Sequence, residues 1–221
     1  MVISKAKSFE EILGMLEGSS KVFLVGCNDC AALCQTGGED QVKEMATRLT
    51  EAGKTVTGSV LPDAGCHVLD MKRLFRGAKE AVAEAEIMLV MSCGVGTQTA
   101  GEATGGEKRA VPANETLFHG ESQRFGHFEQ RCVQCADCRL GETGNICPNI
   151  RCAKGLMNGP CGGVVDGKCE IDREQDCGWY LIYQALKGFG RLDLMRQIMA
   201  PRDWSKGQSR VVLERKAGGL A

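Results

Sequence analysis

The sequence is poor in aromatic residues, in net charge and in long apolar runs, and each absence excludes a class of function. Aromatic residues make up 5% of the 221 residues, which argues against a surface that stacks nucleic-acid bases. Lys and Arg total 27 and Asp and Glu total 28, so the basic patch typical of nucleic-acid binding is missing. No apolar run approaches the roughly 20 residues of a membrane span. We therefore expect no nucleic acid among the partners and no membrane span.

Targeting signals and histidines are also scarce. The first 16 residues contain no long apolar segment, which predicts that the chain has no signal peptide and is cytoplasmic. The three histidines are His67, His119 and His127, and no arrangement with Ser, Cys or Asp indicates nucleophilic catalysis. His127 lies five residues before Cys132, but we interpret it as a surface or supporting residue rather than a metal ligand. No catalytic residue is expected.

Cysteine, by contrast, is abundant, with 13 in the chain. In a reducing compartment this density indicates metal or redox chemistry. A secreted disulfide scaffold is disfavoured by the odd count and by the missing export signal. The candidate metal ligands are Cys27, Cys30, Cys34, Cys66, Cys93, Cys132, Cys135, Cys138, Cys147, Cys152, Cys161, Cys169 and Cys177.

The densest motif reads Cys132-x2-Cys135-x2-Cys138-x8-Cys147-Pro148. Its first three cysteines have the spacing that opens a bacterial ferredoxin motif. That motif has three residues before its Cys-Pro step, whereas this chain has eight. The spacing therefore predicts an iron–sulfur or zinc centre, with iron–sulfur favoured for the first three cysteines.

Eight cysteines after residue 130 suit two four-ligand centres, but the sequence does not define their pairing. One partition gives the first three a distant fourth ligand and leaves the rest to a second centre. The remaining five are Cys147, Cys152, Cys161, Cys169 and Cys177. For this later group, iron–sulfur and structural four-thiolate zinc both stay open.

Residues 1–118 alternate helical and strand patterns, which predicts an α/β fold: a small doubly wound domain with a parallel sheet. Ser8 is the expected N-cap of the first helix, with Glu11 three residues later. The predicted strands are 21–25, 55–61 and 87–91, and the predicted later helices are 38–52 and 67–85.

Residues 119–221 form a second, Cys-rich domain by this interpretation. Apolar periodicity fades there, and bound metal would supply stability that a small core cannot. A helical pattern returns over 179–199, with a break near Gly188–Gly190, and predicts a C-terminal helical segment. The tail after Pro201 is expected to be loosely held.

The five N-terminal cysteines follow three predicted strands. Cys27, Cys30 and Cys34 follow the first strand, Cys66 the second and Cys93 the third. Loops at the carboxyl ends of neighbouring parallel strands converge on one edge of the sheet, so we expect a four-thiolate site there. The alternative is that Cys66 or Cys93 is a buried core thiol. Dinucleotide binding is disfavoured, because Gly94-Val95-Gly96 does not continue into a complete G-x-G-x-x-G motif.

Segments in both halves of the chain resemble a known family. Residues 131–148, 151–163 and 166–169 resemble the methylenetetrahydrofolate reductase C-terminal domain, most specifically in Asn158-Gly-Pro-Cys-Gly-Gly. The segment Gly26-Cys-Asn-Asp-Cys-Ala-Ala-Leu-Cys resembles the other half of the MetV-type small subunit of that reductase. The resemblance covers nearly the whole chain.

The resemblance implies an iron–sulfur electron-transfer subunit with two or three [4Fe-4S] clusters and with zinc as a further metal. The implied partner is a (β/α)8-barrel subunit that carries FMN and reduces 5,10-methylenetetrahydrofolate to 5-methyltetrahydrofolate, in the reductive acetyl-CoA pathway. Further electron-transfer subunits are also implied. The thirteen cysteines would serve as metal ligands, and this chain would be an accessory rather than a catalytic subunit. Eight βα units need about 200–250 residues, which leaves no room for a barrel here. The alternative is a zinc-binding scaffold that stabilises a partner enzyme without electron transfer.

Overall fold

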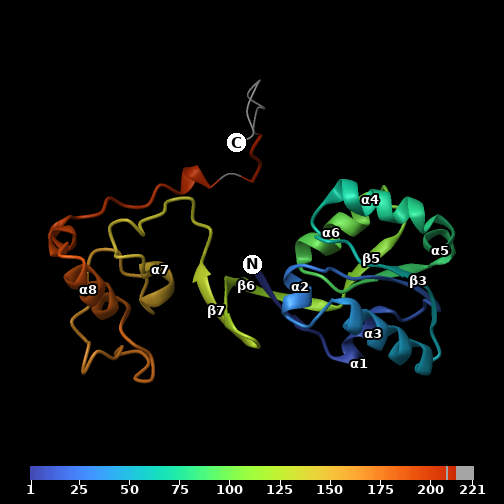
Figure 1. The fold of residues 1–221 in the computed structure, drawn as a ribbon, viewed down its shortest axis with the longest axis horizontal. Coiled ribbons are helices and arrows are strands. Elements are labelled where there is room, and N and C mark those ends of the chain that lie inside the picture. The colour runs from blue at the N-terminus through green and yellow to red at the C-terminus, as the bar shows by residue number, and fades with distance from the viewer. Residues whose placement is uncertain (208, 213–221) are drawn as a thin grey trace. The chain divides into compact units, whose positions relative to one another are not determined.

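The computed structural model describes residues 1–207 and 209–212. The chain forms two compact units, Met1–Gln130 and Arg131–Ala221. The sequence places a boundary after residue 118, whereas strands β6 (Asn114–Arg124) and β7 (His127–Cys132) extend the first unit further along the chain (Figure 1). Each unit is described by itself below.

A four-stranded parallel sheet is the centre of the first unit, with strand order β3-β2-β4-β5. The strands are β2 (Lys21–Val25), β3 (Thr55–Val60), β4 (Ile87–Val90) and β5 (Arg109–Pro112). The three predicted strands are confirmed to within one residue at each end. Strand β5 was not predicted, because Arg109-Ala-Val-Pro is too short to show a pattern.

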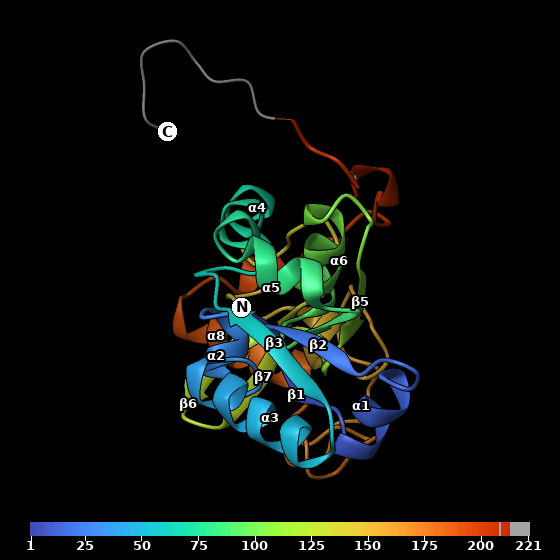
Figure 2. The same cartoon turned by 90° about the vertical axis from the view of Figure 1, so that its right-hand side faces the viewer.

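Helices cover both faces of this sheet, because alternate residues of each strand point to opposite sides. Val22 and Leu24 pack under α1 (Phe9–Met15) and α3 (Glu39–Glu51). Phe23 and Val25 pack on the other face. That face is covered by α4 (Val68–Gly77), α5 (Lys79–Glu84) and α6 (Gly94–Ala103), as Figure 2 shows. The predicted doubly wound α/β fold is confirmed.

Local signals explain several helix ends in this unit. The Ser8 side chain accepts a hydrogen bond from the Glu11 backbone N–H at 3.1 Å, as expected for an N-cap. Gly53 has a φ of 79°, the left-handed conformation that commonly follows a helix. The helix predicted over 67–85 is in fact two helices. The chain leaves helical geometry at Ala78, after the weak helix former Gly77.

A second sheet is antiparallel, with order β1-β6-β7, and was not predicted. Strand β1 is Val2–Ala6, and its Ile3 lies opposite Phe118 of β6. Most side chains of β6 are exposed, so its sequence lacks the apolar alternation of a half-buried strand. Its structure depends on pairing with distant segments.

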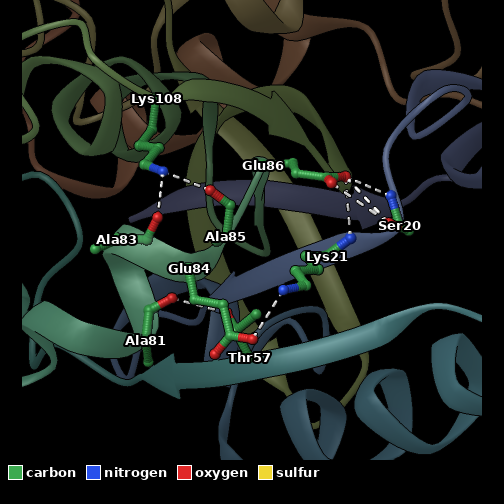
Figure 3. A network of polar contacts seen from close by, with 9 residues as sticks. All are labelled: Ser20, Lys21, Thr57, Ala81, Ala83, Glu84, Ala85, Glu86 and Lys108. Carbon is green, nitrogen blue, oxygen red and sulfur yellow. Dashed lines mark hydrogen bonds and ion pairs between the residues drawn. The ribbon is translucent and has the colours of Figure 1, made fainter.

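Polar contacts fasten the amino-terminal edge of the parallel sheet, where β2, β4 and β5 begin (Figure 3). The Glu86 carboxylate accepts hydrogen bonds from the backbone N–H groups of Ser20, at 2.6 Å, and Lys21, at 3.2 Å. Lys108 donates its ammonium to the carbonyls of Ala83 and Ala85, at 2.8 and 2.5 Å. The cysteine loops lie at the opposite edge of the sheet, where β2, β3 and β4 end.

We expect the stability of the chain to depend on the ionisation of Glu86. The backbone N–H groups of Ser20 and then Lys21 lower the pKa of Glu86 below 4.5. A carboxyl group whose pKa is lower in the folded state stabilises the protein at pH values above its unfolded-state pKa. This stabilisation is lost as the pH falls through the folded-state pKa. Glu86→Gln should therefore lower the urea midpoint at pH 7 and flatten its decline below pH 4.5. Urea titrations of both proteins at pH 7 and at pH values below 4.5 test this prediction. An unchanged pH profile, equal to that of the exposed control Glu51→Gln, would contradict it.

The second unit is built around α8 (Gly178–Gly188). Trp179, Ile182 and Leu186 of this helix are buried, and the Trp179 indole N–H donates to the Leu156 carbonyl at 2.9 Å. Gly190 has a φ of 68°, so the predicted break near Gly188–Gly190 is confirmed. The shorter elements are α7 (Pro148–Arg151), η1 (Leu192–Arg196) and η2 (Trp204–Lys206). Residues 208 and 213–221 of the tail predicted to be loose lie outside the described residues.

In the described part of the chain, no helix combines the length and the apolar character needed to cross a membrane.

Candidate metal centres

The loops after β2, β3 and β4 adjoin at the carboxyl edge of the parallel sheet. The backbone N–H of Gly65, next to Cys66, donates to the Cys27 sulfur at 3.4 Å. A Cβ atom built on Gly65 would lie 3.0 Å from the hydroxyl oxygen of Ser92, which precedes Cys93. The structure therefore brings together the segments that carry Cys27, Cys66 and Cys93. Cys27 is buried, Cys93 is half-buried and Cys66 is exposed.

Cys30 and Cys34 lie against strand β1. Cys30 begins the short helix α2 (Cys30–Leu33), Cys34 is its C-cap residue, and both contact the backbone of Val2. The Val2 N–H donates to the Cys30 sulfur at 3.5 Å, and the Cys34 thiol donates to the Val2 carbonyl at 3.9 Å. Burial is the main cause that raises the pKa of the Cys30 thiol. Strand β1, which was not predicted, thus packs against these two cysteines through the backbone of Val2.

Glycine holds the Cys27 loop close to the sheet. The Cys27 backbone N–H donates to the Gly37 carbonyl at 2.8 Å. A Cβ atom built on Gly37 would lie 1.7 Å from the carbonyl oxygen of Met91, the residue after β4. No side chain fits there, so the sequence needs glycine at position 37 to bring the two loops together.

In the second unit, four cysteines line a single cavity of about 340 Å³. We call them the Cys132 set: Cys132, Cys135, Cys138 and Cys147. The cavity lining is mostly apolar apart from the cysteines and the charged side chains of Arg131, Asp137, Arg139 and Arg202. Cys147, at the Cys-Pro step, thus lines the same cavity as the first three cysteines, whereas the sequence left the fourth member of this group open.

The loop that carries the Cys132 set is held in an unusual backbone conformation. Gln134 and Ala136 have φ values of 54° and 56°, which non-glycine residues seldom adopt. The turn at Gln134 directs its N–H to the Cys132 sulfur at 3.2 Å. Hydrogen bonds of this kind stabilise thiolate and tune a metal centre.

Charged groups tie this loop to the end of the chain. Asp137 pairs with Arg139 at 2.9 Å and lies 3.6 Å from the Lys206 ammonium, measured from carboxylate oxygen to nitrogen. Its hydrogen bond with Arg139 is the main cause that lowers the pKa of Asp137. The segment 202–206 therefore lies beside the cysteine loop, although the sequence predicted a loose tail there.

The other four cysteines of the unit line a second, much smaller cavity of about 10 Å³. We call them the Cys152 set: Cys152, Cys161, Cys169 and Cys177. Cys177 is the buried N-cap residue of α8. Backbone hydrogen bonds from Cys169 to Gln175 and from Cys177 to Gly167, at 2.9 and 2.8 Å, position two members of this set. The two cavities divide the eight cysteines four and four.

The two sets differ in how well they fit a metal group. Four thiols around a large cavity match the ligand set of a [4Fe-4S] cluster, so the Cys132 set fits. The cavity of the Cys152 set has room for about one water-sized sphere and does not fit a cluster in this conformation. Its four thiols match the donors of structural zinc. Among the residues described, no three Cys, His, Asp or Glu side chains converge closely enough to hold a single ion.

The remaining sequence candidates have structural positions. His67 is the N-cap residue of α4, His119 lies in β6 and His127 begins β7. Gly94-Val95-Gly96 forms the first turn of α6, and the Gly94 N–H donates to the Thr116 hydroxyl at 2.8 Å. Sequence reasoning missed Arg202 and Asp137, because single charged residues outside a motif give no signal.

Comparison with known proteins finds a family similarity for part of the chain. Residues 111–205 match the family described as "Methylene-tetrahydrofolate reductase C terminal". This stretch contains both cysteine sets, and the match confirms the predicted resemblance to the methylenetetrahydrofolate reductase small subunit. The match covers less than half of the chain, and it shows that this stretch is similar to a domain of methylenetetrahydrofolate reductase. No curated protein and no solved structure matches the chain.

Proposed function

We propose that this chain is the iron–sulfur electron-transfer subunit of a methylenetetrahydrofolate reductase complex. The observation that carries the proposal is the placement of all four cysteines of the Cys132 set around one cavity, within the stretch that matches the family. The Cys132 set would hold a [4Fe-4S] cluster. The cluster would supply one-electron redox chemistry.

The residues of the chain would hold and shield that centre. The four thiolates bind it, and the Gln134 N–H stabilises the Cys132 sulfur. The apolar lining limits water at the centre, and the Asp137 pairs with Arg139 and Lys206 hold the loop in place. The Cys152 set lies next to the buried α8 core and has the four thiols that structural zinc uses, but these thiols would have to draw closer together to hold the ion. The N-terminal cysteines are proposed ligands of a further centre.

Folate reduction would take place on a partner. The described part of this chain has a four-stranded open sheet and no (β/α)8 barrel. The family match favours association with a methylenetetrahydrofolate reductase catalytic subunit. That partner would carry FMN, collect two electrons and reduce 5,10-methylenetetrahydrofolate to 5-methyltetrahydrofolate.

The proposal is tested by mixing this chain, purified without oxygen and reduced with dithionite, with an oxidised flavin-containing methylenetetrahydrofolate reductase subunit. Excess dithionite is removed before the two proteins are mixed. After mixing, we expect the visible absorption of the chain to return while the flavin absorption bleaches. A complex that forms with a colourless, zinc-containing chain would support the scaffold alternative. A coloured chain that forms the complex but transfers no electrons would contradict the relay.

A further inference from the structure

The side chain of Arg202 borders the cavity of the Cys132 set without belonging to any cysteine motif. Its guanidinium lies over the Trp204 ring, 5.1 Å from the ring centre. In the favoured orientation of the Asn149 amide, the Asn149 oxygen accepts from both terminal guanidinium nitrogens of Arg202, with the Nη1 contact at 2.9 Å. Two neighbours thus fix the position of the positive charge beside the cavity.

One N–H donor of this guanidinium, at Nε, lacks an acceptor in the described part of the chain. Arg202 Nε is buried and has no hydrogen-bond partner among the residues described. A buried donor without an acceptor is costly, and such groups are rare in folded proteins. Arg202 lines the same cavity as the four thiols of the Cys132 set, and a cysteine sulfur can accept a hydrogen bond from such an N–H group.

Two other positive charges of this loop region lie beside a carboxylate, unlike that of Arg202. Arg139 is paired with Asp137, and Lys206 lies beside the same carboxylate. The carboxylate of Asp137 offsets one of these two positive charges. Arg202 has no carboxylate partner among the residues described, because Asn149 is neutral and Trp204 contributes a ring. Its charge therefore acts on the cavity without a paired carboxylate.

We propose that Arg202 sets the reduction potential of the centre held by the Cys132 set, by donating its Nε–H to a sulfur atom and by placing a positive charge beside the cavity. This inference rests on the proposed iron–sulfur centre. One-electron reduction adds one negative charge to a group that four thiolates already make anionic. A nearby cation and an N–H···S hydrogen bond stabilise the reduced form more than the oxidised form, so they raise the potential.

The test compares the full chain with Arg202→Met, which keeps the length of the side chain but removes the charge and the donors. Midpoint potentials are measured by anaerobic redox titration, followed by the EPR signal of the reduced cluster. We expect a negative shift in Arg202→Met and a smaller negative shift in Arg202→Lys, which retains the charge. Arg196→Met, at an exposed arginine of η1 outside the cavity lining, is the control and should leave the potential unchanged.

The possible outcomes separate this inference from the proposed function. EPR reports only on chains that contain the cluster, so incomplete loading of a variant does not obscure its potential. An unchanged potential in Arg202→Met, with the wild-type EPR signal, would overturn the role of Arg202 while leaving the centre in place. A wild-type chain without iron and sulfide would overturn the proposed function itself.

Discussion

Replacing Cys135 by serine is expected to remove about four iron and four sulfide ions per chain, because the variant lacks one of the four ligands of the proposed cluster. The same change should destabilise the second unit. Its buried core is small and consists of Cys177, Trp179, Ile182 and Leu186, so the proposed metal would contribute to its folding. Iron and sulfide analysis, combined with thermal unfolding followed by Trp fluorescence, measures both effects.

The matched control is Cys161→Ser, which alters the Cys152 set and leaves the Cys132 set intact. This variant should retain the iron of the first centre and lose the metal of the second. Equal iron loss in both variants would mean that the eight cysteines do not divide four and four. Unchanged metal content and stability in Cys135→Ser would show that the Cys132 set is not a ligand set.

Truncating Phe23 to alanine is expected to destabilise the first unit by about 3–5 kcal/mol, the usual cost of Phe→Ala in a core. Phe23 is fully buried in strand β2, and its ring meets that of Phe75 edge to face at a centroid distance of 6.0 Å. This loss is a large part of the ~5–15 kcal/mol that stabilises a typical domain. Because β2 leads directly into the Cys27 loop, the N-terminal cysteine region should become more reactive to thiol reagents.

The two units can be followed separately in this experiment. Both tryptophans, Trp179 and Trp204, belong to the second unit, so Trp fluorescence follows that unit and circular dichroism follows both. Urea titrations should show an early transition in circular dichroism alone. Phe125→Ala is the control, since this side chain is 78% exposed in the same unit and its removal should change little. A shift of similar size in the two variants would contradict the assigned core.

The α/β fold was predictable because its strands are short apolar runs bounded by turn signals. Lys21–Val25 and Ile87–Val90 are buried along most of their lengths, so their apolar character shows in the sequence. Strands β1 and β6 were missed for the opposite reason. Pairing across more than 100 residues, as between Ile3 and Phe118, defines them, and their local pattern does not.

The cysteines were predictable as candidates, but their grouping was not. Spacing indicated that Cys132, Cys135 and Cys138 act together, yet nothing in it decided the fourth member. The fold suggests the grouping that we propose, because α7 begins directly after Cys147 and α8 directly after Cys177, and these two cysteines line different cavities. The position of Arg202 beside the cavity, on which its proposed role rests, depends on the path of the chain after η1 and has no signal in the sequence.

The most direct test of the account is a count of iron, acid-labile sulfide and zinc per chain, in protein purified without oxygen. We predict at least about four iron with an equal amount of sulfide, together with zinc or further iron for the remaining thiolates. Zinc with no iron or sulfide would contradict the proposed electron-transfer role and would leave the scaffold function.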